Sequence, residues 1–262
     1  YEAYLSRITK KVSKDSKRRA ELYLNHFQDT PLKDITKPFL NKAIQDIHYS
    51  DGKAREPQTI RRYLSVLVAI LNQGEDTFDV KPPKLKLPSN KSPQRLSYFE
   101  DSEVWRIIEA AEGDCIEPVI HFMMLMGARP IECYRLTWDD VKLAGPTNSF
   151  AYFKSYKGNG ELVERPIDMP TITYHMLQRY GDTYGRSGRI VRKETGKPWK
   201  MPADSDQTGG TLTTGPRKRV YAIFEKAGAR KLRPYDMRHT FATRLRAAGC
   251  ELDELMKYMG HE

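Results

Sequence analysis

Apolar residues recur three and four positions apart along three stretches of the first 80 residues. The first stretch has this spacing at Ala20, Tyr23, Leu24 and Phe27. The second has it at Leu40, Ala43, Ile44 and Ile47, and the third at Ile60, Leu64, Leu67, Val68 and Leu71. Such spacing puts the apolar side chains on one face of a helix. The pattern therefore predicts a helical domain over residues 1–80.

The next fifteen residues, 81–95, have a different composition. They contain four prolines and five basic residues. Proline cannot continue a helix, and proline-rich segments with like charges stay extended. We therefore predict a basic linker over residues 81–95 and a second domain over residues 96–262.

Helical spacing returns in the second domain and is interrupted by one β pattern. Helices are predicted over residues 100–112 and 118–126, and again near 216–227, 236–248 and 251–259. Residues 149–157 and 161–169 are rich in aromatic and β-branched side chains and flank Gly158-Asn159-Gly160, which is typical of a β-hairpin. Residues 186–215 are polar and predict a long loop. The fold class is therefore mainly α with a small β-sheet (α+β).

The charge of the chain indicates what kind of partner it binds. The 262 residues carry 44 Lys and Arg against 34 Asp and Glu, a net charge of +10. Residues 1–95 hold 19 basic and 11 acidic side chains, and residues 96–262 hold 25 and 23, so +8 of the +10 lies in the first part. A surplus of this kind indicates a polyanionic partner, most often nucleic acid.

Other compositional features exclude whole classes of protein. The sequence has no run of 18 apolar residues, so we expect no membrane span and no membrane partner. Three widely spaced cysteines, at positions 115, 133 and 250, favour neither a disulfide framework nor a zinc cluster. With a polar start that lacks the apolar core of a signal peptide, the chain is expected to be cytoplasmic.

Three short motifs carry the candidate chemistry. Gly127-Ala-Arg129-Pro-Ile-Glu132 starts a predicted helix, where free backbone N–H groups favour an anion. Tyr235-Asp-Met-Arg238 starts another helix, and Met259-Gly-His261 ends a third. Each motif alone also fits a plain structural role, such as a salt bridge or a helix cap.

Taken together and in this order, the motifs resemble those of the tyrosine recombinases, the phage-integrase family. The resemblance extends over nearly the whole chain, since residues 1–80 are similar to the family's helical, SAM-like core-binding domain, and residues 96–262 to its catalytic domain. It implies a site-specific recombinase or integrase that cuts and rejoins DNA through a covalent phosphotyrosyl bond, in the integration or excision of a mobile element. The reaction conserves bond energy, so no cofactor, ATP or metal is expected.

The resemblance also implies a role for each motif residue. Arg129 and Arg238 would neutralise the charge that builds on the phosphoryl oxygens, because guanidinium stays charged and engages two oxygens at once. His261 would donate a hydrogen bond to the same phosphate. A lysine of the hairpin would protonate the leaving oxygen as a general acid.

Two lysines of the hairpin are candidates for that acid. Lys157 precedes the Gly158-Asn159-Gly160 turn and matches the family position better, so we favour it. Lys154 remains an alternative, and otherwise a DNA contact. Three residues along a strand separate the two, so their side chains lie on opposite faces and only one can point into the site.

The sequence departs from the family pattern in two places. Tyr235 occupies the position of the family's first box histidine. A phenol can hydrogen-bond a phosphate but, with an ordinary pKa near 10, it is a poor base at neutral pH. The family's nucleophilic tyrosine follows the Gly-His pair, and none of the fifteen tyrosines stands there, so we expect it beyond Glu262. His239 is interpreted as structural.

The expected partner is double-stranded DNA at an attachment or recombination site. Arg61 and Arg62 lie off the apolar stripe of their helix and are predicted to contact it. The resemblance implies a tetramer on paired DNA sites and accessory DNA-bending proteins. Two alternatives remain at this point: a non-catalytic DNA-binding protein of integrase descent, and an enzyme like the type IB topoisomerases.

Overall fold

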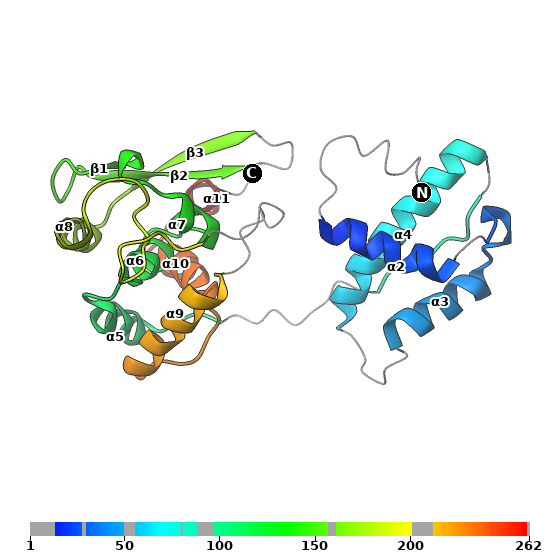
Figure 1. Cartoon of the computed structure of the whole chain (residues 1–262), viewed down its shortest axis with the longest axis horizontal. Coiled ribbons are helices and arrows are strands. Elements are labelled where there is room, and N and C mark those ends of the chain that lie inside the picture. Colours follow the sequence, from blue (N-terminus) through cyan, green and yellow to red (C-terminus); the bar gives the residue numbers. More distant parts are fainter. Residues whose placement is uncertain are drawn as a thin grey trace. The chain divides into compact units, whose positions relative to one another are not determined.

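The chain divides into two compact units, residues 1–95 and residues 96–262. The computed structural model describes residues 14–27, 30–49, 56–79, 81–88, 97–156, 161–200 and 212–260. Helices dominate both units, and the second unit also carries a small sheet (Figure 1). The predicted fold class is therefore confirmed.

The first unit contains the three predicted helices. They are α2 (Lys14–Phe27), α3 (Lys37–Tyr49) and α4 (Pro57–Phe78), with a short 3₁₀ turn, η1 (Leu32–Asp34), between the first two. The apolar stripes meet in one core, in which Tyr23, Leu40 and Leu67 have no exposed surface. One buried polar contact joins α2 to α3, because the Tyr23 hydroxyl lies 2.8 Å from Nε2 of His48.

The first half of the proline-rich segment packs on this unit. Residues 81–88 form no helix or strand, as expected, but Leu85 and Leu87 lie against the helical core. Arg61 of α4 also donates a hydrogen bond from Nη1 to the Pro88 carbonyl oxygen at 2.8 Å. Residues 81–88 therefore follow the surface of the first unit and are not a free spacer.

The second unit is built around α6 (Glu117–Leu125). Residues 117–124 of this helix are all buried, and α6 packs against four other helices. These are α5 (Asp101–Ala111), α7 (Pro130–Arg135), α8 (Thr171–Tyr184) and α10 (Asp236–Ala247), while α9 (Thr214–Lys226) packs on α5. Apart from Glu117 and His121, the residues of α6 are apolar, as expected of a helix in the centre of a core. The last helix, α11 (Leu252–Met259), contacts α10.

The predicted hairpin is present as the larger part of a three-stranded antiparallel sheet. Its strands are β1 (Val141–Lys142), β2 (Phe150–Tyr156) and β3 (Leu162–Asp168), in that spatial order, and η2 (Trp138–Asp140) precedes them. Phe153 pairs with Arg165, and Lys154 pairs with Glu164. Directly opposed residues share a face of the sheet. Phe153 is fully buried, so Arg165 lies on the face toward the helices, and Lys154 and Glu164 lie on the other.

The sequence reading missed α8. Its buried residues Thr173, Met176, Leu177 and Tyr180 have the same helical spacing as the helices that were predicted. The long loop predicted over residues 186–215 is shorter at its end, because α9 begins at Thr214. Within the described part of that loop, isolated bridges join Thr137 to Arg189 and Arg192 to Pro198.

Glu103 of α5 fixes the start of the second unit to the segment before α10. Its buried carboxylate accepts hydrogen bonds from the Arg230 side chain, at 2.6 Å from Nη2, and from the backbone N–H of Arg230 and Glu100. Hydrogen bonds from the Arg230 side chain are the largest cause that holds the pKa of Glu103 at about 2.

Replacing Glu103 by Gln is expected to lower the free energy of unfolding by about 1.5–3 kcal/mol at pH 7, since charged hydrogen bonds are lost. Because the pKa of Glu103 is lowered in the folded protein, its carboxylate stabilises the fold fully at pH values above the usual pKa of 4.5. This stabilisation is lost as the pH falls toward 2. In urea unfolding, the difference in unfolding free energy between wild type and Glu103→Gln should therefore shrink between about pH 5 and pH 2. This interval spans the usual pKa and the folded pKa of Glu103. Glu109→Gln, an exposed change on the same helix, is the control and should show no deficit.

Candidate active site: three arginines around a buried glutamate

A glycine turn brings Arg129 and Arg238 together. Gly127 follows α6 with φ of +63°, and a Cβ at this position would lie 2.4 Å from the Phe241 ring of α10. Only glycine adopts this turn with α10 packed so closely. The turn leads directly into Arg129, the N-cap residue of α7. The carbonyl oxygen of Gly127 accepts a hydrogen bond from Nη1 of Arg238.

Glu132 is the centre of the site. Its side chain is fully buried in the first turn of α7. One carboxylate oxygen accepts the backbone N–H of Arg129 at 2.6 Å, and the other accepts Nη1 of the same arginine at 3.0 Å. Nη1 of Arg238 lies 3.9 Å from the carboxylate. The anion expected at this helix start is therefore, in part, the protein's own glutamate.

The structure adds a third arginine that the sequence reading missed. Arg165 of β3 donates from Nη2 to Glu132 at 3.0 Å, and its guanidinium lies 5.5 Å from the centre of the Phe153 ring. A signal was present in the sequence. In the predicted strand 161–169, side chains two residues apart share a face, so Val163, Arg165 and Ile167 lie on the same face. Arg165 is thus a charged residue between two apolar ones.

The same three arginines hold the end of α11. Arg165 donates to the carbonyl oxygen of Tyr258, Arg238 to that of Met259 and Arg129 to that of Gly260, the last at 2.8 Å. The last carbonyl groups of a helix have no partner within the helix and carry partial negative charge. Each of these three consecutive carbonyl oxygens therefore accepts a hydrogen bond from a different arginine.

The electrostatics of this cluster favour an added anion. Three guanidinium groups and one carboxylate give these four side chains a net charge of +2. Burial, with Arg129 as a neighbouring cation, lowers the pKa of Arg238 to about 10, and burial also lowers the pKa of Arg165. Both arginines remain charged at neutral pH. A phosphate would relieve their mutual repulsion and engage planar, two-pronged donors.

The three arginines differ in access. The Arg129 side chain is 18% exposed and that of Arg165 is 11% exposed, whereas Arg238 is 1% exposed. Arg238 is in the first turn of α10, as the sequence predicted, but the Met259 carbonyl occupies one of its nitrogens. Arg129 is thus the more open of the two predicted arginines.

Lys154 lies away from this cluster. It is on the opposite face of the sheet from Arg165 and pairs with Asp140 at 2.5 Å and with Glu164 at 3.5 Å. The hydrogen bond to Asp140 raises the pKa of Lys154. A general acid for neutral pH needs a pKa closer to that pH, so this environment makes Lys154 a weaker proton donor. Lys157, the favoured candidate, lies outside the described residues.

Tyr235 is the N-cap residue of α10, and its carbonyl oxygen accepts the backbone N–H of Arg238 at 3.1 Å. Its half-buried ring lies edge-on against the ring of His239, with centres 5.2 Å apart. The structural role expected for His239 stays a prediction. Burial lowers the pKa of His239. His261 lies outside the described residues.

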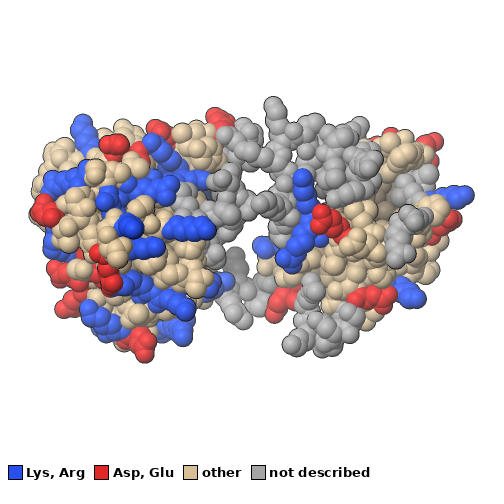
Figure 2. Space-filling model, in the orientation of Figure 1, with Lys and Arg blue, Asp and Glu red and all other residues tan. Residues whose placement is uncertain are grey.

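In the first unit, the two arginines predicted to contact DNA have different environments. Arg62 is exposed on α4, whereas Arg61 is partly buried and bonded to Pro88. In the second unit, Figure 2 shows Lys and Arg side chains in several groups over the visible face. Such a surface suits an extended polyanion better than a small molecule.

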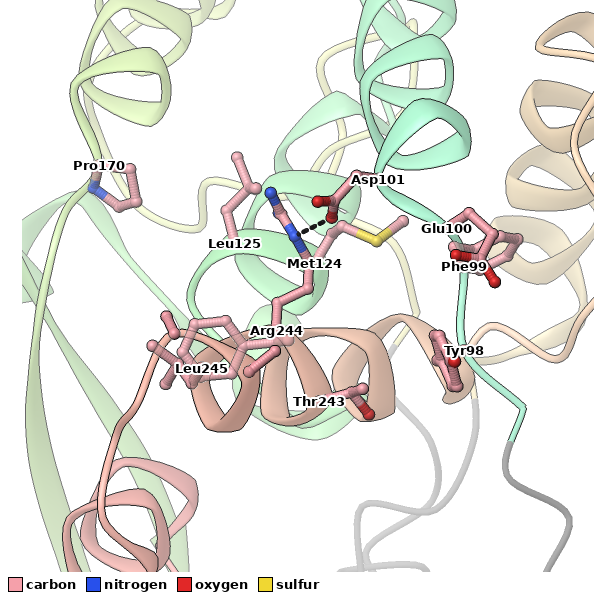
Figure 3. Close-up of a pocket in the computed structure, with 13 residues that line it drawn as sticks. Tyr98, Phe99, Glu100, Asp101, Met124, Leu125, Pro170, Thr243, Arg244 and Leu245 are labelled. Carbon is pink, nitrogen blue, oxygen red and sulfur yellow. Dashed lines mark ion pairs between the residues drawn. The ribbon is translucent and has the colours of Figure 1, made fainter.

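A cavity of about 740 Å³ opens elsewhere in the second unit, between the start of α5, the end of α6 and α10. Arg244 and Asp101 form an ion pair of 2.7 Å at this cavity (Figure 3). None of the predicted site residues lines it. The candidate site is therefore the arginine cluster and not this cavity.

Among the described residues, no three His, Cys, Asp or Glu side chains are grouped as metal ligands. None of the helices found in those same ranges is long and apolar enough to cross a membrane.

Comparison with known sequences gives consistent relatives. The sequence model of the phage integrase family matches residues 97–262. The integrase of Salmonella phage P22 is 25% identical over 292 residues, which cover 97% of this chain and 70% of the relative. Tyrosine recombinase XerC of Halalkalibacterium halodurans is 25% identical over 263 residues, covering 92% of this chain and 81% of the relative.

Solved structures share the fold at low sequence identity. The Tn1549 transposon integrase in complex with transposon right end DNA has a TM-score of 0.70 at 19% identity, with 100% of this chain and 90% of that chain covered. A lambda integrase dimer bound to a core site has a TM-score of 0.69 at 14% identity, with 98% and 91% covered. A lambda integrase tetramer bound to a Holliday junction has a TM-score of 0.64 at 14% identity, with 100% and 72% covered.

Replacing Glu132 by Gln is expected to lower the free energy of unfolding by about 3–5 kcal/mol, because it removes the anion among three buried or half-buried cations. Thermal and urea unfolding at pH 7 would measure the loss. Glu164→Gln, at a 48% exposed carboxylate in the adjacent sheet, is the matched control and should cost less than about 1 kcal/mol. Equal effects of the two changes would contradict the central role of Glu132.

Proposed function

This chain belongs to the phage integrase family, and we propose that it is a site-specific DNA recombinase, an integrase that cuts and rejoins duplex DNA in the integration or excision of a mobile element. The observation that carries the proposal is the convergence of Arg129 and Arg238 on Glu132. Two motifs separated by more than a hundred residues meet there in a positively charged site.

In the proposed reaction, a tyrosine hydroxyl attacks a DNA phosphorus atom. A bond forms between the tyrosine oxygen and phosphorus, and the bond to a deoxyribose oxygen breaks. The released hydroxyl, or one from another strand, later reverses the step. The proposed nucleophile is the tyrosine that follows the Gly-His pair in the family pattern. Neither step consumes a cofactor, since each phosphoester bond that breaks is replaced by another.

The arginines supply the stabilisation of the transition state. As negative charge builds on the phosphoryl oxygens, Arg129 and Arg238 donate hydrogen bonds to them from fixed positions. Glu132 keeps both guanidinium groups oriented before DNA arrives, so little reorganisation remains for the reaction step. Because Arg238 is 1% exposed, a phosphate that reaches it must replace the Met259 carbonyl at one of its nitrogens.

The remaining roles extend this proposal to residues of the same motifs. Lys157 is the proposed general acid for the leaving oxygen, because Lys154 is on the far face of the sheet and engaged by two carboxylates. His261 donates a hydrogen bond to the phosphate, and Tyr235 provides a phenol where the family has histidine. The phenol serves as a hydrogen-bond donor and not as a base.

The proposed partner is double-stranded DNA carrying a recombination site. The two units would contact the duplex, and the protein would act as a tetramer on paired sites, with accessory DNA-bending proteins. Relatives whose structures contain DNA, a dimer on a core site and a tetramer on a Holliday junction, support this assembly. We place the reaction in the cytoplasm, where three unpaired cysteines would stay reduced.

Arg238→Ala in the full-length protein is expected to slow covalent capture of DNA by about 10²- to 10³-fold or more, because a donor to the developing charge is lost. DNA affinity should stay close to wild type. The assay uses a nicked recombination site that traps the protein–DNA adduct, resolved by denaturing electrophoresis, with a gel-shift assay alongside.

Three results would contradict this assignment in distinct ways. Wild-type capture by Arg238→Ala would remove its catalytic role. DNA binding without any adduct from the wild-type protein would favour a non-catalytic DNA-binding protein. Relaxation of supercoiled DNA that lacks a recombination site would favour a topoisomerase.

Arg62→Ala is expected to weaken DNA binding and to reduce the slope of log affinity against log salt concentration by about 1, as one phosphate contact is lost. Arg62→Lys keeps the charge and should keep the slope. Fluorescence anisotropy at several salt concentrations measures both. An unchanged slope in Arg62→Ala would show that α4 does not contact the phosphates at this position.

A further inference from the structure

Arg165 joins the arginine cluster from the sheet, while Arg129 and Arg238 join it from helices. Its Nη2 donates to Glu132 at 3.0 Å and its Nη1 donates to the Tyr258 carbonyl. One guanidinium group therefore links β3, α7 and the end of α11. None of the motif roles assigned above includes this residue.

A purely structural ion pair accounts poorly for Arg165. Glu132 already pairs with Arg129 and has Arg238 within 3.9 Å, so a third guanidinium adds a cation where cations are in excess. Burial and the neighbouring Arg129 charge both lower the pKa of Arg165. Burying a charge in such surroundings costs stability. Proteins retain costs of this kind at functional sites, where a fixed geometry is needed.

The bonds of Arg165 act on both groups that orient Arg129. The Glu132 oxygen that accepts Arg165 also accepts the Arg129 backbone N–H, at 2.6 Å, and the other oxygen holds Arg129 Nη1. Through Nη1, Arg165 donates to the carbonyl oxygen of Tyr258. Tyr258 lies two residues before Gly260, whose carbonyl oxygen accepts a hydrogen bond from Nη2 of Arg129. Arg165 thus fixes both acceptors of the Arg129 guanidinium.

The close fit around α11 supports this reading. A Cβ added at Gly260 would lie 3.2 Å from Nε of Arg165 and 3.2 Å from Nη1 of Arg129. Gly260 also has φ of +62°, a conformation that suits glycine. The end of α11 therefore rests directly on the two arginines, and a displacement of Arg165 would move it.

We propose that Arg165 is a positioning residue for DNA cleavage, which holds Glu132 and the end of α11 so that Arg129 meets the phosphate in a fixed orientation. The inference rests on the proposed recombinase function. In this role Arg165 acts through Glu132 and Tyr258, to which its Nη2 and Nη1 atoms donate, and not as a ligand of the phosphate. A planar guanidinium spans these two acceptors, whereas a lysine ammonium can reach one of them at a time.

The test measures single-turnover covalent capture by full-length Arg165→Ala and Arg165→Lys proteins on a nicked recombination site at saturating DNA. Misplacement of Arg129 by about 1 Å is expected to lower the rate constant by about 10²-fold. Arg165→Lys should recover little of this loss, although it restores the charge. Ethylguanidinium added to Arg165→Ala should restore part of the rate, because it refills the site with the same planar donor.

Two measurements separate positioning from a loss of folding. The amplitude of the reaction reports the fraction of active molecules, and the rate constant reports the site of each active molecule. The proposal predicts a normal amplitude, a dissociation constant for DNA close to wild type and a reduced rate constant. Arg186→Gln, which removes a 45% exposed arginine that also pairs with a carboxylate, should leave all three unchanged.

The outcomes are distinguishable. A reduced amplitude with a normal rate constant in Arg165→Ala would make the residue structural and overturn the inference. Full recovery by Arg165→Lys would replace positioning by a simple charge effect and also overturn it. Absence of any adduct from the wild-type protein would overturn the proposed function, and the inference with it.

Discussion

The buried carboxylate of Glu132 is the interaction on which the rest of the second unit depends. It caps α7 through the Arg129 backbone and gathers the side chains of Arg129, Arg165 and Arg238. Without this anion, three guanidinium groups at the junction of a sheet and three helices would repel one another in a poorly hydrated space. The carboxylate makes the convergence possible, and the residual charge of +2 leaves room for a phosphate.

A cluster of this kind also needs acceptors when no DNA is present. The end of α11 provides them, because the carbonyl oxygens of Tyr258, Met259 and Gly260 each accept from one arginine. Each of the three arginines therefore has a carbonyl acceptor within the protein. DNA must offer better acceptors than these carbonyls, and charged phosphate oxygens do so. The same contacts tie the segment leading to His261 to the two arginines of the proposed reaction.

The sheet separates two kinds of charged residue. Arg165 faces the helices and enters the cluster, whereas Lys154 faces away and pairs with Asp140 and Glu164. Because alternate residues of a strand point to opposite faces, a single position decides whether a side chain belongs to the site or to the surface. This alternation keeps Lys154 away from the arginine cluster, which supports the proposal of Lys157 as the acid.

Short-range patterns in the sequence determined most of the elements and the motif residues. Helical spacing predicted α2 to α6 and α9 to α11, the Gly158-Asn159-Gly160 turn predicted the hairpin, and the order of motifs indicated the family. The same spacing was present in α8 and was overlooked. Only the tertiary structure decided that Arg165 joins Glu132, that Lys154 does not, and that Arg238 is buried under α11. These outcomes depend on which distant elements pack together. Contacts between residues far apart in the chain produce no short-range pattern in the sequence from which they could be predicted.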